Sequence, residues 1–187
     1  MIDKEKISEA IASIISAIGE NSDREGLQNT PTRIADMYSE LFSGINKDPS
    51  NCFKNAFKES HQDLVILSNI EFSSICEHHF LPFFGKAYIS YIPEFKTAGA
   101  SKFAECVDIL SKRPQLQERL TAQIANTIYE TINPKGVEVL LQATHMCISM
   151  RGINKMDAKL VTHAIRGDIP ENTLFKEILA SNQDVLH

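Results

Sequence analysis

The chain has 187 residues, 43% of them hydrophobic and 23% charged, which is the composition of a folded globular protein, and its length favours a single domain. The 19 Lys and Arg residues against 24 Asp and Glu give a net charge of −5, so the chain as a whole has no positive field that would attract nucleic acid or an anionic membrane. These values exclude intrinsic disorder as the main state and leave any anionic ligand to a local cluster of residues.

The first 60 residues are expected to form an N-terminal helical segment. Isoleucines recur at helical spacing over residues 7–18, with Asp3 as the expected cap, and a second helix is expected over residues 30–42, where a threonine–proline pair begins the pattern. Charged residues stand where a signal peptide would need an apolar core, and no run of about 18 apolar residues follows. We therefore expect a cytoplasmic protein without a membrane span.

Residues 61–187 are expected to form an α+β domain. Three stretches are rich in the β-branched and aromatic residues typical of strands: 64–72, 85–92 and 137–150. Three others show helical spacing: 101–110, 115–131 and 171–181. Alternating strands with two helices between them favour an antiparallel sheet with the helices on one face.

Two short segments concentrate side chains that can bind a metal ion: Cys76-Glu77-His78-His79 and His145-Met146-Cys147. Cys76 and His79 are three residues apart, a separation that a turn can close around an ion. His145 and Cys147 would share one face of an extended strand, because strand side chains alternate. Thiolate and imidazole together favour zinc among the common metals.

The number of ligands is left open by this spacing. Three protein ligands leave one position for water, as in catalytic zinc sites, and the spare histidines, with an ordinary pKa near ~6.5, would suit proton transfer at neutral pH. The alternative is a closed structural site, in which the fourth ligand is His78, His145, or one of the cysteines Cys52 and Cys106. Zinc would then only clamp strands in a binding or scaffold protein.

A further candidate site begins the helix expected at 115–131. The carboxylate of Glu118 can accept two parallel hydrogen bonds, as the adjacent N–H and NH₂ donors of a guanine edge would give. A charged first turn is, however, usually a solvated helix start. Several basic residues lie near these motifs in the sequence and could hold phosphates if they converge: Lys102, Arg113, Arg119, Arg151, Lys155 and Arg166.

Four motifs follow one another along the chain, at 76–79, 99–102, 113–121 and 144–152, and a helical start at 26–33 precedes them. In order and separation they resemble the GTP cyclohydrolase I family, from about residue 24 onward. The resemblance implies the tunnelling fold, in which the antiparallel sheets of neighbouring subunits join into a barrel. It also implies a homodecamer of two stacked five-membered rings, with active sites built at subunit junctions.

The activity implied by the resemblance is hydrolysis of the guanine imidazole ring of GTP to formate and 7,8-dihydroneopterin triphosphate, the first step of pterin and tetrahydrofolate biosynthesis. The implied ligands of a Zn²⁺ ion are Cys76, His79 and Cys147. The implied proton-transfer residues are His78, His145 and Ser101. The implied substrate-binding residues are Gln117 and Glu118 at the guanine edge, Lys102 and Arg151 at the triphosphate, and Arg33.

Two residues depart from the family pattern where the triphosphate would bind. Glu105 stands where the family usually has an arginine, and Asp36 where many bacterial members have a lysine. Both changes would weaken a triphosphate pocket, and they motivate an alternative, a purine-ring-opening relative of the same fold whose substrate has fewer phosphates. Arg166, at a position where an apolar residue is common, is a candidate to replace the lost cation.

Overall fold

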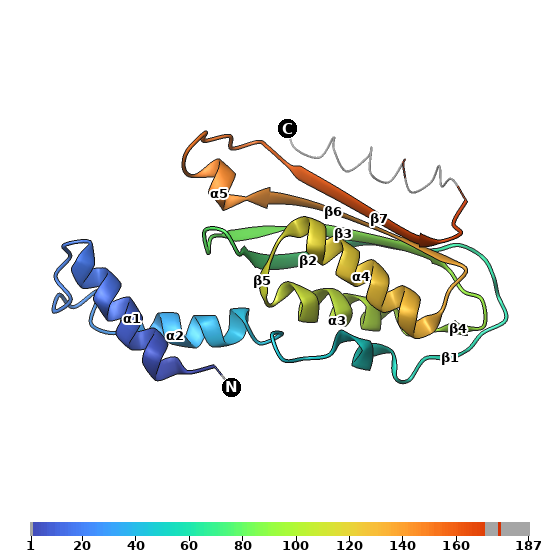
Figure 1. Cartoon of the computed structure of the whole chain (residues 1–187), viewed down its shortest axis with the longest axis horizontal. Coiled ribbons are helices and arrows are strands. Elements are labelled where there is room, and N and C mark those ends of the chain that lie inside the picture. Colours follow the sequence, from blue (N-terminus) through green and yellow to red (C-terminus); the bar gives the residue numbers. More distant parts are fainter. Residues whose placement is uncertain (1, 171–175, 177–187) are drawn as a thin grey trace.

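In the computed structural model, which describes residues 2–170 and residue 176, two long helices cover one face of a five-stranded sheet (Figure 1). The strand order is β5-β2-β3-β6-β7. The strands are β2 (Val65–Cys76), β3 (Pro82–Ile92), β5 (Pro114–Gln115), β6 (Gly136–His145) and β7 (Leu160–Gly167). Neighbouring strands are antiparallel except β2 and the short β5. The predicted α+β class is confirmed.

The core lies between the sheet and the helices α3 (Ala100–Ser111) and α4 (Gln117–Ile132), both of which the sequence predicted to within two residues. Phe103 of α3 and Ile124 of α4 are fully buried with Phe83 and Leu141 of the sheet. Burying each such side chain stabilises the fold by about 1.5–3 kcal/mol relative to leaving it exposed. This packing fixes where the first turn of α4 stands over the strand ends.

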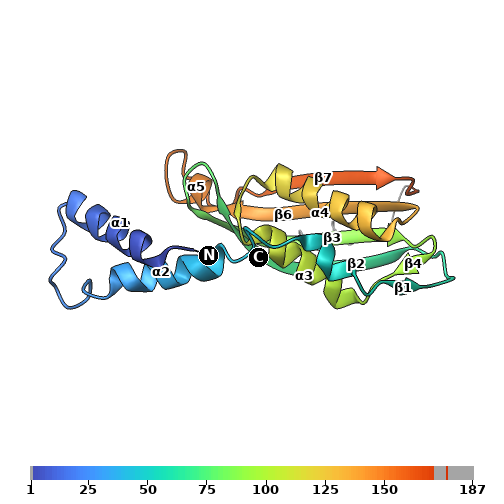
Figure 2. The same ribbon diagram turned by 60° about the horizontal axis from the view of Figure 1, so that its bottom comes forward.

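The helices α1 (Lys4–Ala17) and α2 (Thr30–Leu41) pack on each other and project from one end of the sheet (Figure 2). Asp3 caps α1 as predicted, its carboxylate accepting a hydrogen bond from the backbone N–H of Lys6. Asp36 of α2 forms an ion pair with Lys4 of α1 at 2.8 Å. Within the chain, Asp36 therefore links the two helices.

The segment after α2 belongs to the sheet-and-helix core by its packing. Cys52 and Phe53, in the short helix η1 (Pro49–Phe53), are buried in that core, and β1 (Phe57–Lys58) pairs with β4 (Lys96–Thr97). The domain boundary expected at residue 60 stays a prediction. On packing grounds we would place it before residue 49.

Two differences from the predicted strands lie at the C-terminal side of the sheet. The strand expected over 137–150 ends at His145, and residues 146–149 form the short helix α5 (Met146–Ser149). Strand β7 was not predicted. The helix expected over 171–181 lies outside the described residues. In the part of the chain that the structure describes, we find no helix with the length and hydropathy to cross a membrane.

Candidate active site

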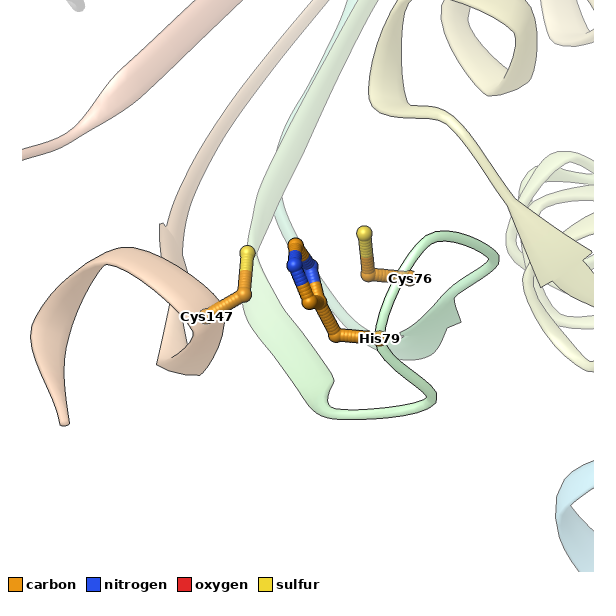
Figure 3. A group of neighbouring side chains, drawn as sticks. All are labelled: Cys76, His79 and Cys147. Carbon is orange, nitrogen blue, oxygen red and sulfur yellow. The ribbon is translucent and has the colours of Figure 1, made fainter. Parts of the chain in front are cut away.

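The three expected metal ligands converge where β2 ends and α5 begins. Cys76 is the last residue of β2, His79 lies in the turn to β3, and Cys147 is in α5. Figure 3 shows their side chains projecting to the same side, with the His79 ring between the two sulfur atoms. Their ligand atoms all lie within 4.8 Å of one another, the only such group that the described residues contain. We refer to these three residues as the metal group.

The turn between β2 and β3 is held by its own backbone and by α4. Phe80 donates its N–H to the carbonyl of Cys76 at 2.9 Å and takes a positive φ of 54°, which closes the turn. Glu77 makes a bidentate ion pair with Arg119 of α4, in which one N–O distance is 3.0 Å. Both residues lie in motifs that the sequence singled out, but no pattern there indicated that they pair.

Cys147 reaches the metal group by a route that the sequence did not indicate. The expectation that His145 and Cys147 share a face of one strand is wrong, because β6 ends at His145. The hydroxyl of Ser149 donates to the carbonyl of His145 at 3.0 Å, and Met150 donates its N–H to Met146 at 3.1 Å. These bonds close a helical turn, and this turn brings Cys147 toward His79.

The donor set fits a zinc ion. Burial raises the pKa of the Cys147 thiol, and the neighbouring sulfur of Cys76 raises it further. Two sulfurs this close are favourable as thiolates only when a cation neutralises them, and two thiolates with one imidazole are zinc ligands. Cys52 and Cys106 are buried in the core and are not members of the group. The closed site that would recruit either of them is therefore not supported.

His145, an expected proton-transfer residue, is buried at the end of β6, with 6% of its surface exposed. Its ring stacks on that of Phe83, with centroids 4.5 Å apart and planes 6° from parallel. Its Nε2 lies 2.8 Å from Oε1 of Gln117. Burial lowers the pKa of this imidazole, against the opposing effect of the Glu118 carboxylate.

Gln117, expected at the guanine edge, is fully buried in this chain. Its Nε2 donates toward the carbonyls of Leu141 and Leu160, at 3.1 and 3.0 Å, and toward the hydroxyl of Thr162 at 3.0 Å. Its Oε1 faces His145. Within the chain, the Gln117 amide contacts the protein itself, and its expected place at the guanine edge stays a prediction.

The other expected acid–base and guanine-binding side chains lie near the metal group. His78 is exposed beside it, with its ring 6.4 Å from that of His79. Glu118 is exposed at the start of α4 and acts electrostatically on His145. Arg151 is also exposed, and its charge opposes the burial that raises the pKa of Cys147. These positions allow a ligand to approach from solvent.

Ser101 and Lys102 begin α3, at its far end from the metal group. The other end of α3 is held to β2 at Ser111, whose carbonyl accepts a hydrogen bond from Ser74 at 2.6 Å. Lys102 lies nine residues before Ser111, about 14 Å along the helix at 1.5 Å per residue. Its ammonium is paired with Glu105 at 2.7 Å. Within one chain, therefore, neither residue joins the metal group.

Two further expected cations, Arg33 and Arg166, are also placed by single-chain geometry. Arg33 is exposed on α2. Arg166 pairs with Val137, eight residues from His145 along β6, or about 26 Å at 3.3 Å per residue. Its guanidinium donates to Asn126 Oδ1 at 2.6 Å and to the carbonyl of Ile165 at 2.7 Å. Arg166 thus does not join the metal group of its own chain.

Comparisons of the sequence with known proteins cover the segments that form this site. The family model described as GTP cyclohydrolase I matches residues 7–183. The chain is 51% identical over 186 residues to "GTP cyclohydrolase 1" of Streptococcus pyogenes serotype M1, covering 99% of this chain and 93% of that protein. It is 49% identical over 186 residues to "GTP cyclohydrolase 1" of Bacillus subtilis (strain 168), with 99% and 95% covered.

Among solved structures, the archaeosine synthase QueF-Like in the apo form matches with a TM-score of 0.49 and 20% identity, over 60% of this chain and 100% of that one. The assignment itself rests on the family model and on the two relatives, both matched over 99% of this chain. By its sequence along nearly its whole length, the chain belongs to the GTP cyclohydrolase I family.

Proposed function

We propose that this chain is a zinc-dependent GTP cyclohydrolase I, which hydrolyses the guanine imidazole ring of GTP to formate and 7,8-dihydroneopterin triphosphate. The proposal rests mainly on one observation, the convergence of Cys76, His79 and Cys147 in a member of this family. Three protein ligands are the number found in catalytic zinc sites, whereas structural sites use four.

The proposed chemical roles are those that the resemblance to the family implies. Zinc held by the metal group would supply Lewis acidity, which makes hydroxide available near neutral pH. His145 would take up a proton from the attacking water and deliver it to N7 of the guanine as the water adds at C8. The exposed His78 would relay protons to the sugar, together with Ser101. The exposed carboxylate of Glu118 would hold the N–H and NH₂ donors of the guanine edge.

We further propose that a second subunit completes the site. Ser101 and Lys102 lie at the far end of α3 from the metal group, which supports a site in which they come from another chain. Arg151 beside the metal group, and Arg33, would provide further positive charge for the triphosphate. A homodecamer of two stacked pentamers, acting in the cytoplasm at the first step of tetrahydrofolate biosynthesis, is the assembly that we propose.

The alternative of a substrate with fewer phosphates gains no support from the relatives, which are named GTP cyclohydrolase 1. A purely structural zinc clamp would need a fourth ligand, and the metal group of the described residues has three.

The test is to incubate the zinc-loaded protein with GTP, measure formate, and search for fluorescent neopterin after oxidation. We expect both products from the unchanged chain and neither from Cys147→Ser. A fully zinc-loaded protein that releases no formate would contradict the proposal. Equal rates of formate release from GTP, GMP and guanosine would contradict recognition of the triphosphate.

A further inference from the structure

The buried amide of Gln117 connects three elements of the fold at the position of His145. It stands at the start of α4, donates toward Leu141 of β6 and Leu160 of β7, and faces His145 through Oε1. The residue is 0% exposed. A buried polar side chain with this many partners is held in one orientation, because any rotation would leave several polar groups unpaired.

The partners fix which end of the amide faces the histidine. The carbonyl oxygens of Leu141 and Leu160 can only accept hydrogen bonds, so the NH₂ group of Gln117 must face them. Its Oε1 then faces His145 and carries no proton. The imidazole nitrogen 2.8 Å away must therefore be the donor, and Nε2 of His145 carries the ring proton. When the ring carries this proton alone, Nδ1 is the nitrogen with the free lone pair.

Two threonines complete the hydrogen-bond network around the Gln117 amide, and each of their hydroxyl groups donates one hydrogen bond within it. Thr162 accepts from Gln117 at 3.0 Å and lies 2.6 Å from the hydroxyl of Thr121. Thr121 in turn donates to the backbone carbonyl of Gln117 at 2.7 Å. The chain of hydrogen bonds thus begins and ends at Gln117. The stacked ring of Phe83 fixes the plane of the His145 ring. The tautomer is thus set by the fold.

We propose that Gln117 is a positioning residue, which holds the His145 ring so that only Nδ1 is available to take up and deliver the proton of the reaction. The inference rests on the proposed function. It replaces the role at the guanine edge that the sequence suggested, because an amide engaged by β6, β7 and His145 has no accessible edge left for a ligand. The two roles differ in whether the loss of Gln117 affects turnover or substrate binding.

The deciding experiment compares Gln117→Leu with the unchanged zinc-loaded enzyme. A positioning role predicts that kcat falls by about tenfold or more, since catalytic rates are sensitive to small misplacements, while KM for GTP changes by less than about twofold. A guanine-binding role predicts instead that KM rises by about tenfold or more with kcat less affected, and this result would overturn the proposal.

A comparison of binding in the absence of His145 removes the dependence on activity. GTP binding is measured by calorimetry on His145→Ala and on the double variant with Gln117→Leu. If Gln117 acts through His145, the Kd of the double variant for GTP stays within about twofold of the Kd of His145→Ala. A rise of about tenfold in Kd in the absence of His145 would mean that Gln117 contacts the substrate directly, against the proposal.

A second variant decides the matter if Gln117→Leu does not fold. Thr162→Val removes one acceptor of the Gln117 amide and should lower kcat by a smaller factor, about two- to tenfold, with KM unchanged. An unchanged kcat, or a raised KM, would overturn the proposal. Gln142→Leu is the matched control, because Gln142 lies on the opposite face of β6 from His145 and should leave both constants unchanged. If the unchanged chain releases no formate, the proposed function itself fails.

Discussion

Replacing His145 by alanine should cost stability as well as activity, because its ring is part of the core. The substitution leaves Oε1 of Gln117 buried without its donor and removes the ring stacked on Phe83. An unpaired buried acceptor costs about 1–3 kcal/mol and an aromatic pair contributes about 0.5–1.5 kcal/mol, so we expect the free energy of unfolding to fall by about 1.5–4.5 kcal/mol. In a chain of this size each kcal/mol lowers Tm by about 2–4 °C.

Urea unfolding at fixed protein and zinc concentrations measures this loss. His145→Gln restores an N–H donor with similar reach and should recover part of it while remaining inactive. His163→Ala is the control: His163 is exposed on β7, where it pairs with Glu138, and its loss should cost less than about 1 kcal/mol. If His145→Ala unfolds within about 0.5 kcal/mol of the unchanged chain, the hydrogen bond to Gln117 is absent and the tautomer argument fails.

Three further predictions concern metal binding, charge and packing. Cys147→Ser should lower the zinc content, measured by atomic absorption after dialysis, from about one ion per chain to a small fraction of that, and full retention would exclude Cys147 as a ligand. Glu105→Gln frees Lys102 from its ion pair and should lower the KM for GTP by up to about fivefold at low salt, while the KM for guanosine stays unchanged. An equal change in the two KM values would contradict a contact between Lys102 and the phosphates. Gly85→Ala should lower the free energy of unfolding by about 1–3 kcal/mol, because the added Cβ would meet the backbone carbonyl of Gln142. Gly99→Ala is the control and should not lower it, because a Cβ at Gly99 would meet open space. Equal free energies of unfolding for the two variants would contradict this packing.

The sequence predicted those features that depend on short-range pattern. The cap at Asp3, the two helices over the sheet and the long strands β2 and β3 follow from periodicity and from residue preferences over a few turns. The identity of the metal group was also predictable once the family resemblance was recognised. In each case the signal lies within a segment, or within a motif of fixed spacing.

Features that depend on tertiary contacts were not predictable from the same patterns. Strand β7 alternates between half-buried and exposed residues, as expected for an edge strand, so no apolar run marks it. The end of β6 at His145 is set by a local helical turn, which the β-branched and apolar residues after it did not indicate. The burial of Gln117 depends on β6 and β7 packing over α4, and a glutamine in a polar first turn gives no sign of it.

The first turn of α4 shows why neighbouring residues in a motif need not share a role. Successive residues of a helix point about 100° apart, so Gln117, Glu118 and Arg119 face three directions. Gln117 faces the buried ring of His145, Glu118 faces solvent, and Arg119 reaches Glu77 in the turn that bears the metal ligands. One rigid turn, held by the core, thus positions His145, the exposed carboxylate and the turn of the metal group relative to one another. A shift of α4 would disturb all three together.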